Sequence, residues 1–327
     1  MEKIFIDKDF KKRESTLLME FQFHDICNIK CSYCKLNSGK NVLKEIYLDN
    51  LYTFIVEKEL YKKFNNIEIM IMGGETLIDI KILDYLLLTF KKINKLIKIS
   101  HVLVLSNFVL CTELIEQQLN KIKDCGFNTE LEITLHAQEY SFDQLKLFMK
   151  NYNYFKDDVI SINVLEGVLT NKRYKILYKH LLSNLIKDGK KVHNVYICDV
   201  NKIKYDGLCF ISNKNILSTF GIEISSLGNT FINNNKEYSL GYINEHFISS
   251  KKCLCNVRNN LVLDASGHVR WCGNFDQFQE DVIPDIKMIP EHFDQIFNYF
   301  FTDNYIECPY NLCMGGIFKE LKIKDIE

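Results

Sequence analysis

The chain has 327 residues, of which 47% are hydrophobic and 25% are charged, and its formal net charge is −1. This length allows one large domain or a domain with an appendage, and this composition can bury a proper core. The near-zero charge gives no general attraction to nucleic acid or to an anionic membrane, so neither is expected as a partner. Residues 1–16 are rich in Lys, Asp and Glu, and no apolar run has the length of a spanning helix. We therefore expect a soluble, cytoplasmic protein without a signal peptide.

Short apolar runs alternate with amphipathic stretches over about the first 200 residues. Runs rich in Ile and Val are typical of parallel strands covered on both faces, and the stretches between them are typical of crossover helices. The expected strands are residues 21–26, 67–72, 101–105, 130–135, 158–165 and 192–200. The expected helices are residues 49–64, 78–96, 113–124, 141–152 and 170–186.

This alternation predicts an α/β fold, because right-handed crossovers would curl the parallel strands into a partial (β/α)6 barrel. Sites in such arrays lie at the carboxyl ends of the strands. The fourth helix has Ser141 as its expected N-cap and four residues spaced to share one face, namely Phe142, Leu145, Phe148 and Tyr152. Residues 221–242 are rich in Asn, Ser and Gly, and are expected to form hairpins and turns. We expect the part of the chain after the barrel to pack against it.

The cysteines are concentrated towards the two ends of the chain. Three lie between Cys27 and Cys34, and five lie after residue 250, namely Cys253, Cys255, Cys272, Cys308 and Cys313. A disulfide framework is the less favoured interpretation, because the sequence shows no secretion signal. Clustered thiolates in a cytosolic chain instead indicate metal or iron–sulfur sites.

The first expected strand runs into Cys27-Asn-Ile-Lys-Cys31-Ser-Tyr-Cys34, which has the spacing C-x3-C-x2-C. Three thiolates can hold three irons of a [4Fe–4S] cube and leave the fourth iron open to a small bidentate ligand. Zinc sites more often have four Cys or His ligands, and only His24 lies nearby as a fourth. A zinc site or a plain structural role is the alternative.

This triad, with Tyr33 before its third cysteine, resembles that of the radical S-adenosylmethionine (SAM) superfamily. In that family the open iron chelates the amino and carboxylate groups of SAM. Reductive cleavage of SAM then releases a 5′-deoxyadenosyl radical, which abstracts a hydrogen from the substrate. The cofactors carry the difficult chemistry, and the protein supplies position and shielding. The resemblance covers about residues 20–200 and implies a radical SAM core at residues 17–205.

Gly73-Gly74-Glu75 comes after the second expected strand and resembles the GGE motif of the family. There the backbone and the carboxylate receive the SAM ammonium group, since glycines allow close approach and a carboxylate pairs with a cation. Thr76 replaces the usual proline. An ordinary turn is the alternative.

Later strand ends also resemble parts of the family's SAM site. Ser106-Asn107-Phe108 is similar to a Thr-Asn-Gly segment near the SAM ribose and carboxylate, with Phe in place of Gly. Thr134-Leu-His136 is similar to a Ser-Leu-His/Asp segment beside the ribose, although a simple strand-end histidine is the alternative. Asn163 on the fifth strand is a further candidate contact.

Residues 206–327 are expected to form a small C-terminal extension that binds a second cluster. The segment from Cys255 to Cys272 predicts a β-hairpin with its turn at residues 264–267 and Gly267 at a positive φ. This hairpin and a loop with Cys308 and Cys313 would offer four thiolates to a fully ligated auxiliary [4Fe–4S] cluster.

The extension resembles the SPASM and twitch domains of radical SAM enzymes. A full SPASM domain has seven cysteines, so the single-cluster twitch arrangement fits better. Either Cys253 or Cys255 is the first ligand, and we favour Cys255 because its spacing to Cys272 suits a tight hairpin. A four-cysteine zinc ribbon is the alternative, because thiolate spacing alone does not separate zinc from iron.

The resemblance implies an enzyme that modifies a ribosomally made peptide by crosslinking, epimerisation or oxidation. We expect no N-terminal recognition domain, so recognition of the peptide would lie on this chain or on a separate protein. An electron donor such as flavodoxin or ferredoxin is a further implied partner. The alternatives are a dehydrogenase or epimerase of a sugar or aminocyclitol, and a non-enzymatic iron–sulfur or zinc scaffold.

Cys198 lies near the end of the sixth expected strand and is a candidate catalytic residue. Its thiol could return a hydrogen atom to a substrate radical, which would make the reaction an epimerisation. A buried core cysteine is the alternative, because free cysteine is commonly buried.

Overall fold

The computed structural model describes the parallel core of the chain and several segments nearer its C-terminus. The described residues are 15–31, 34, 39–136, 140–165, 188, 191–197, 208–209, 223–224, 230–233, 236–241, 259–270 and 286–301.

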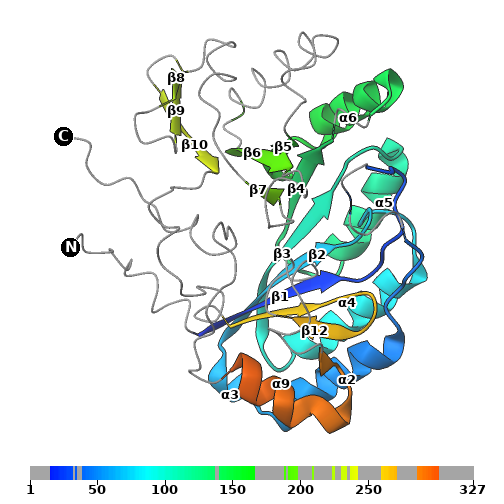
Figure 1. Cartoon of the computed structure of the whole chain (residues 1–327), viewed down its shortest axis with the longest axis vertical. Helices are drawn as coiled ribbons and strands as arrows, with labels where there is room; N and C mark the ends of the chain where they lie inside the picture. Colours follow the sequence, from blue (N-terminus) through cyan, green and yellow to red (C-terminus); the bar gives the residue numbers. More distant parts are fainter. Residues whose placement is uncertain are drawn as a thin grey trace, which may run out of the picture.

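A run of parallel strands forms the centre of the molecule, and each strand pairs with the next one along the chain. These strands are β1 (Thr16–Gln22), β2 (Asn66–Met72), β3 (Lys98–Ser106), β4 (Thr129–Leu135), β5 (Val159–Leu165) and β6 (Lys191–Ile197). The helices between them are α2 (Glu45–Glu57), α3 (Leu60–Lys63), α4 (Lys81–Asn94), α5 (Thr112–Lys123) and α6 (Phe142–Phe155). In Figure 1 the helices lie along one side of a curved sheet. The α/β class and the parallel order are as predicted.

The fifth crossover helix is predicted at residues 170–186, which lie outside the described residues. The complete (β/α)6 repeat therefore stays a prediction. Among the described helices, none is both long enough and apolar enough to cross a membrane.

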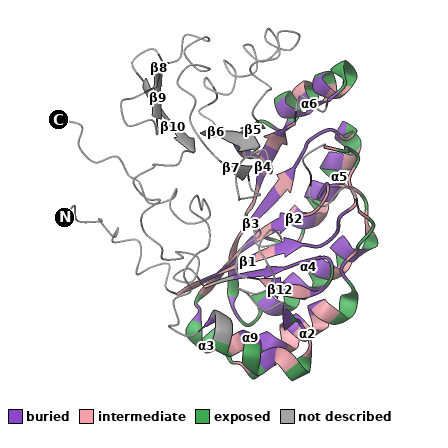
Figure 2. Ribbon diagram, in the orientation of Figure 1, coloured by how far each residue is buried: buried purple, intermediate pink, exposed green. Residues whose placement is uncertain are grey.

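The strands bury one face more completely than the other. In β2, Ile67, Ile69 and Ile71 are at most 1% exposed, whereas Glu68 and Met70 between them are half-buried. Figure 2 shows the buried positions where the sheet meets the helices, and the exposed ones on the outer helix surfaces. Within the described residues, the helix side of β2 is covered closely and its other face is half-buried, so coverage of both faces stays a prediction.

Two predicted boundaries differ from the structure for local reasons. The first strand, predicted at residues 21–26, begins at Thr16 and ends at Gln22. Residues 23–25 keep backbone bonds to the end of β2 and to the residues after it, and on their other side they pair with residues 41–43. The helix predicted at residues 49–64 begins at Glu45 and is broken where Glu59 adopts a left-handed backbone with φ of 50°.

The cap predicted for α6 is confirmed. The Ser141 hydroxyl accepts the Gln144 backbone N–H at 3.2 Å, and the Gln144 side chain accepts the Ser141 N–H at 2.8 Å. The predicted apolar face is correct for three of its four residues, but Phe142 is 42% exposed. At the first turn its ring points outward, and the Lys146 ammonium lies 4.4 Å from the ring centroid.

Residues far along the chain extend the sheet at both edges. On the β1 side, β11 (Asn260–Leu263) pairs parallel with β1, and β12 (His268–Arg270) and β13 (Ile286–Lys287) continue antiparallel. On the β6 side, β10 (Lys236–Gly241) pairs parallel with β6, and β9 (Thr230–Asn233) and β8 (Glu223–Ile224) continue antiparallel. The short β7 (Leu208–Cys209) pairs antiparallel with β6.

A short helical segment after β13 packs on the first helix of the core. It consists of the 3-10 turn η4 (Pro290–His292) and α9 (Phe293–Phe300), which lies beside α2 in Figure 1. The Phe293 ring lies 5.4 Å from the Phe54 ring of α2, and Lys58 pairs with Asp294. For these residues, the later part of the chain packs against the core as expected.

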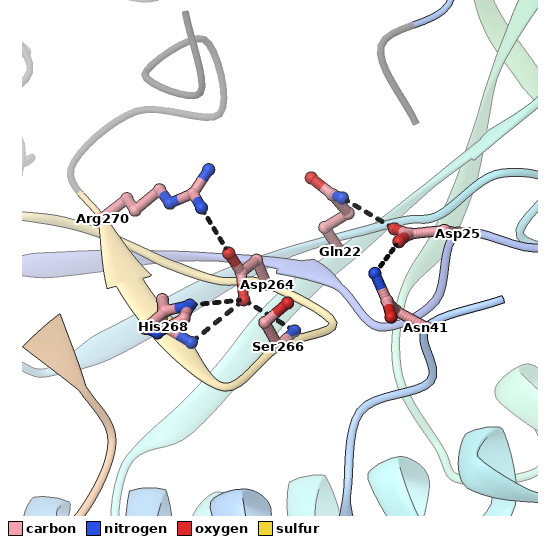
Figure 3. A network of polar contacts seen from close by, with 7 residues as sticks. All are labelled: Gln22, Asp25, Asn41, Asp264, Ser266, His268 and Arg270. Atoms are coloured by element: carbon pink, nitrogen blue, oxygen red, sulfur yellow. Dashed lines mark hydrogen bonds and ion pairs between the residues drawn. The ribbon is translucent and has the colours of Figure 1, made fainter. Parts of the chain in front are cut away.

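The turn between β11 and β12 is built around Asp264 (Figure 3). Its buried carboxylate accepts the backbone N–H groups of Ser266 at 2.8 Å and His268 at 3.0 Å. It also pairs with the Arg270 guanidinium at 2.7 Å. Gly267 has the predicted positive φ, at 83°. Binding of a cluster by this part of the chain stays a prediction, because its cysteines lie outside the described residues.

Replacing Gly267 with alanine should destabilise the turn by more than backbone strain alone. A left-handed backbone costs a non-glycine residue about 1–2 kcal/mol. A Cβ at Gly267 would in addition lie 2.4 Å from the Tyr47 ring of α2. Gly126 is the matched control, since its φ is 82° and no described atom lies within 4 Å of its Cβ position. Urea unfolding should show a larger loss for Gly267→Ala than for Gly126→Ala, and equal losses would contradict the contact with Tyr47.

Candidate active site

The two ends of the loop that carries the three N-terminal cysteines lie side by side and are joined by backbone hydrogen bonds. The Leu43 N–H donates to the Phe23 carbonyl, and the Asp25 N–H donates to the Asn41 carbonyl, both at 2.9 Å. The buried Asp25 carboxylate accepts the side-chain amides of Asn41 at 2.7 Å and Gln22 at 3.2 Å, as Figure 3 shows. These bonds close the base of the cysteine loop against the carboxyl end of β1.

Cys27, Cys31 and Cys34 are partly buried free thiols on this loop. A turn joins the last two, because the Cys34 N–H donates to the Cys31 carbonyl at 3.0 Å. Burial raises the pKa of the Cys27 thiol, and hydrogen bonds from Ile29 and Asn107 act in the opposite direction. Among the described residues, no three Cys, His, Asp or Glu side chains converge closely enough to hold a single metal ion.

The surroundings of Cys27 fit a thiolate ligand of an iron–sulfur cluster. Two N–H donors are aimed at its sulfur, from the Ile29 backbone at 3.5 Å and from the Asn107 side chain at 3.6 Å. Such donors stabilise negative charge on sulfur, which is the form in which cysteine binds iron. A bound metal deprotonates its thiol ligand outright, so the raised pKa is no obstacle to ligation.

Gly73 and Gly74 pack directly against the segment that leads into Cys27. The Gly74 N–H donates to the His24 carbonyl at 2.8 Å, and the Glu75 N–H donates to the Ile26 carbonyl at 2.9 Å. A Cβ at Gly74 would lie 2.3 Å from the Ile26 oxygen, which is far inside normal contact. This close approach of two backbones requires glycine.

His24 lies fully buried beneath Gly73. Its ring atoms would be 3.0 Å from a Cβ at Gly73, and within the described part of the chain neither ring nitrogen has a partner in hydrogen-bond geometry. Burial lowers the pKa of His24 to about 4, so the ring is neutral at pH 7. It packs edge-on against Phe23. The structure places this ring with the glycines, and among the described residues it does not group with the cysteines as a fourth ligand.

Glu75 ties the end of β2 to the end of β3. Its fully buried carboxylate accepts the Leu77 N–H at 3.0 Å, the Ser106 hydroxyl at 2.7 Å and the Asn107 N–H at 2.6 Å. Burial raises the pKa of Glu75 to about 7, and these hydrogen bonds oppose the shift. Two carboxylate oxygens offer about four acceptor positions, of which the described residues use three.

Asn107 links the end of β3 to the cysteine loop. Its side-chain amide donates to the Asn28 oxygen at 2.8 Å as well as to Cys27, and its own oxygen accepts the Val109 N–H at 2.9 Å. The Asn28 amide in turn donates to the Val109 carbonyl. No sequence pattern indicates this pairing, because Asn28 and Asn107 are 79 residues apart.

Tyr140 links the end of β3 to the end of β4, and the sequence analysis did not identify this residue as part of the site. Its buried hydroxyl lies 2.8 Å from the Asn107 carbonyl and 3.1 Å from the Thr134 carbonyl. The His136 ring lies 6.2 Å from the Tyr140 ring, edge to face. Burial lowers the pKa of His136 to about 4, so this ring is also neutral at pH 7.

The structure thus gathers the predicted residues at the ends of β1 to β4. Asn163 stands opposite Thr134 in the β4–β5 register, and only its backbone is described. The other predicted site residues lie outside the described residues, namely Tyr33, Cys198, Cys253, Cys255, Cys272, Cys308 and Cys313.

Comparison with solved structures finds the same architecture in anSMEcpe. A structure of native anSMEcpe with bound AdoMet and the Cp18Cys peptide matches with a TM-score of 0.55 at 15% identity, over 92% of this chain and 88% of that chain. A structure of the same protein with bound AdoMet matches with a TM-score of 0.56 at 16% identity, over the same shares of both chains, 92% and 88%.

The chain therefore has the fold of anSMEcpe. No protein-family model matches the sequence, and the comparison with curated proteins finds no significant match. The likeness to anSMEcpe is one of backbone path, since the two chains are only 15–16% identical.

Proposed function

We propose that this chain is a radical SAM enzyme that modifies a peptide. The observation that carries the proposal is the junction at the ends of β1, β2 and β3, where Glu75 and Asn107 are bonded to one another and Asn107 to Cys27. This junction lies in a fold shared with a protein whose structure holds both AdoMet and a peptide.

In this proposal, Cys27, Cys31 and Cys34 hold a [4Fe–4S] cluster whose fourth iron takes SAM. When bound and reduced by one electron from a flavodoxin or ferredoxin, the cluster and SAM supply methionine and a 5′-deoxyadenosyl radical, which takes a hydrogen atom from the substrate. The chain supplies the closed loop that carries the thiols, and two N–H donors that stabilise negative charge on the Cys27 sulfur.

The glycine segment and the later strand ends form the proposed SAM site. The Gly73 and Gly74 backbone and the fourth acceptor position of Glu75 would receive the SAM ammonium group. Further proposed contacts to the SAM carboxylate and ribose come from Tyr33, Ser106, Asn107, Thr134, His136 and Asn163. Ser106 and Asn107 have an additional task, since both hold the Glu75 carboxylate in place.

Two further parts of the proposal rest on sequence. Cys255, Cys272, Cys308 and Cys313 would hold an auxiliary [4Fe–4S] cluster, with Cys253 as the alternative first ligand. Cys198 would donate a hydrogen atom to a substrate radical if the reaction is an epimerisation.

The proposal predicts that the anaerobically reconstituted protein binds about eight irons, four for each cube. With dithionite and SAM it should form 5′-deoxyadenosine, measured by chromatography. The variant with Cys27, Cys31 and Cys34 all replaced by alanine should lose about half the iron and all of this activity. Full cleavage of SAM by that variant would refute the assignment.

The substrate class is tested by adding candidate compounds and measuring which of them stimulate 5′-deoxyadenosine formation. Cysteine-containing peptides, the kind bound in the matched structure, should stimulate it and should change in mass. Stimulation by aminocyclitols or sugars, without any response to peptides, would contradict the peptide proposal and favour a small-molecule dehydrogenase or epimerase.

A further inference from the structure

Asn107 reaches across from β3 to the sulfur of the first cysteine of the triad. One N–H of its side chain donates to Asn28, and the same amide nitrogen lies 3.6 Å from the Cys27 sulfur. The amide is held in this orientation from its other side, because its oxygen accepts the Val109 N–H at 2.9 Å. A flipped amide would lose both of the shorter bonds, so the N–H group faces the sulfur.

The backbone around Asn107 is equally restrained. Its N–H donates to the buried Glu75 carboxylate at 2.6 Å, and its carbonyl lies 2.8 Å from the Tyr140 hydroxyl. The backbone N–H, the backbone carbonyl, the side-chain NH2 and the side-chain oxygen of Asn107 therefore all have fixed partners, and the residue is 5% exposed. Such a donor is preorganised and does not have to reorient when the charge on the sulfur changes.

We infer that Asn107 is a positioning residue that sets the reduction potential of the cluster on Cys27 through its N–H···S contact. The inference rests on the proposed function. Hydrogen bonds to the sulfurs are among the features that set the potential of an iron–sulfur cluster. Adding one electron, from dithionite or a flavodoxin, increases the negative charge that the sulfurs share. A donor aimed at a sulfur stabilises the reduced form more than the oxidised form, so it raises the potential.

The test replaces Asn107 with leucine, which has a similar size and no donor. The one-electron reduction equilibrium should move about tenfold towards the oxidised cluster, which lowers the midpoint potential by about 59 mV. The midpoint is measured by redox titration with electron paramagnetic resonance detection. The relevant cluster is identified as the one whose signal changes when SAM is added. Asn107→Asp is a second variant that can still accept the Val109 N–H, and its added negative charge should lower the potential further.

Asn151 of α6 provides the matched control. It is a fully buried amide that donates to the Phe108 and Leu110 carbonyls at 2.9 and 2.8 Å, and so it holds the same β3 loop from behind. Asn151→Leu should loosen the loop but leave the reduction equilibrium within about twofold of the original protein.

The outcomes separate the inference from the function on which it rests. An original protein without any SAM-responsive cluster would overturn the proposed function, and the inference with it. A SAM-responsive cluster whose potential is the same in the original protein and in both Asn107 variants would overturn the inference alone. Equal shifts in Asn107→Leu and Asn151→Leu would also overturn it, because they would show general loosening of the loop.

Discussion

Replacing Gly74 with alanine is expected to destabilise the protein by about 3 kcal/mol, at the upper end of the usual cost of overpacking. The new methyl group would lie 2.3 Å from the Ile26 oxygen and 2.5 Å from the Asp25 oxygen. Both atoms belong to backbone, so no side-chain rotation can relieve the overlap. The two segments must separate, which breaks the bonds from Gly74 to His24 and from Glu75 to Ile26. Urea unfolding measures the loss of stability, and iron content measures the effect on the cysteine loop.

Gly73→Ala is the matched control for this prediction. Its Cβ would meet the His24 ring and carbonyl at 3.0 Å, a tight contact that a shift of a few tenths of an ångström can relieve. Its effect on stability and iron content should therefore be clearly smaller. If the two alanine variants were equally stable, the close approach at Gly74 would not be the feature that holds the cysteine loop.

Replacing Glu75 with glutamine is expected to weaken SAM binding by about 10- to 150-fold, through loss of a charge-assisted hydrogen bond. The substitution also removes an acceptor inside the protein. Glutamine has one oxygen, so its NH2 group would face the N–H of either Asn107 or Leu77. A buried donor without a partner costs about 1–3 kcal/mol of stability. Equilibrium binding of SAM and urea unfolding measure the two effects separately.

Glu132→Gln is the matched control for Glu75→Gln. Glu132 also accepts a serine hydroxyl from the neighbouring strand, at 2.7 Å from Ser161, but it is only partly buried. Its substitution should leave SAM affinity unchanged. Unchanged affinity in Glu75→Gln as well would show that residues 73–75 form only a turn.

The pH dependence of stability gives a further readout for Glu75. Burial raises its pKa from 4.5 to about 7, so the folded protein holds this proton more tightly than the unfolded chain does. The contribution of Glu75 to stability is therefore fully present below about pH 4.5 and is lost as the pH rises through 7. Glu75→Gln should flatten the pH profile of stability in this window. An unchanged profile would contradict the buried carboxylate.

The parallel core could be predicted from sequence because its signals are local. Runs of Ile and Val indicate a strand, and a repeated apolar face indicates a helix. Both signals lie within a few residues of the position that they predict. The same holds for the cysteine loop, whose spacing is contained in eight residues, and for the Ser141 cap with Gln144 three residues later. Boundaries were less accurate, as at residues 23–25, where a second segment (residues 41–43) also pairs with the chain beyond the end of β1.

The contacts that assemble the site could not be predicted, because they join residues that are distant in sequence. Nothing near Asn28 indicates Asn107, and nothing near Tyr140 indicates that its hydroxyl would reach the ends of two strands. The hydrogen-bond partners of Glu75 could not be predicted for the same reason. Its motif predicted a ligand for an ammonium group, and the structure adds three donors from within the chain that no pattern around Gly73 could reveal.

The pairing of β1 with β11 has a consequence for how the protein is made. Within the described parts of the chain, β11 covers one edge of β1 and α9 covers the apolar face of α2, and Asn50 of α2 bonds to Met288, 238 residues later. During synthesis, the first strand and helix therefore leave the ribosome long before the segments that cover them. An open strand edge is a template for pairing with other chains. N-terminal segments that stay uncovered until distant segments have been synthesised are therefore prone to aggregate. Chaperone binding to the nascent chain, and slower synthesis, should therefore favour a good yield of this protein in a foreign host.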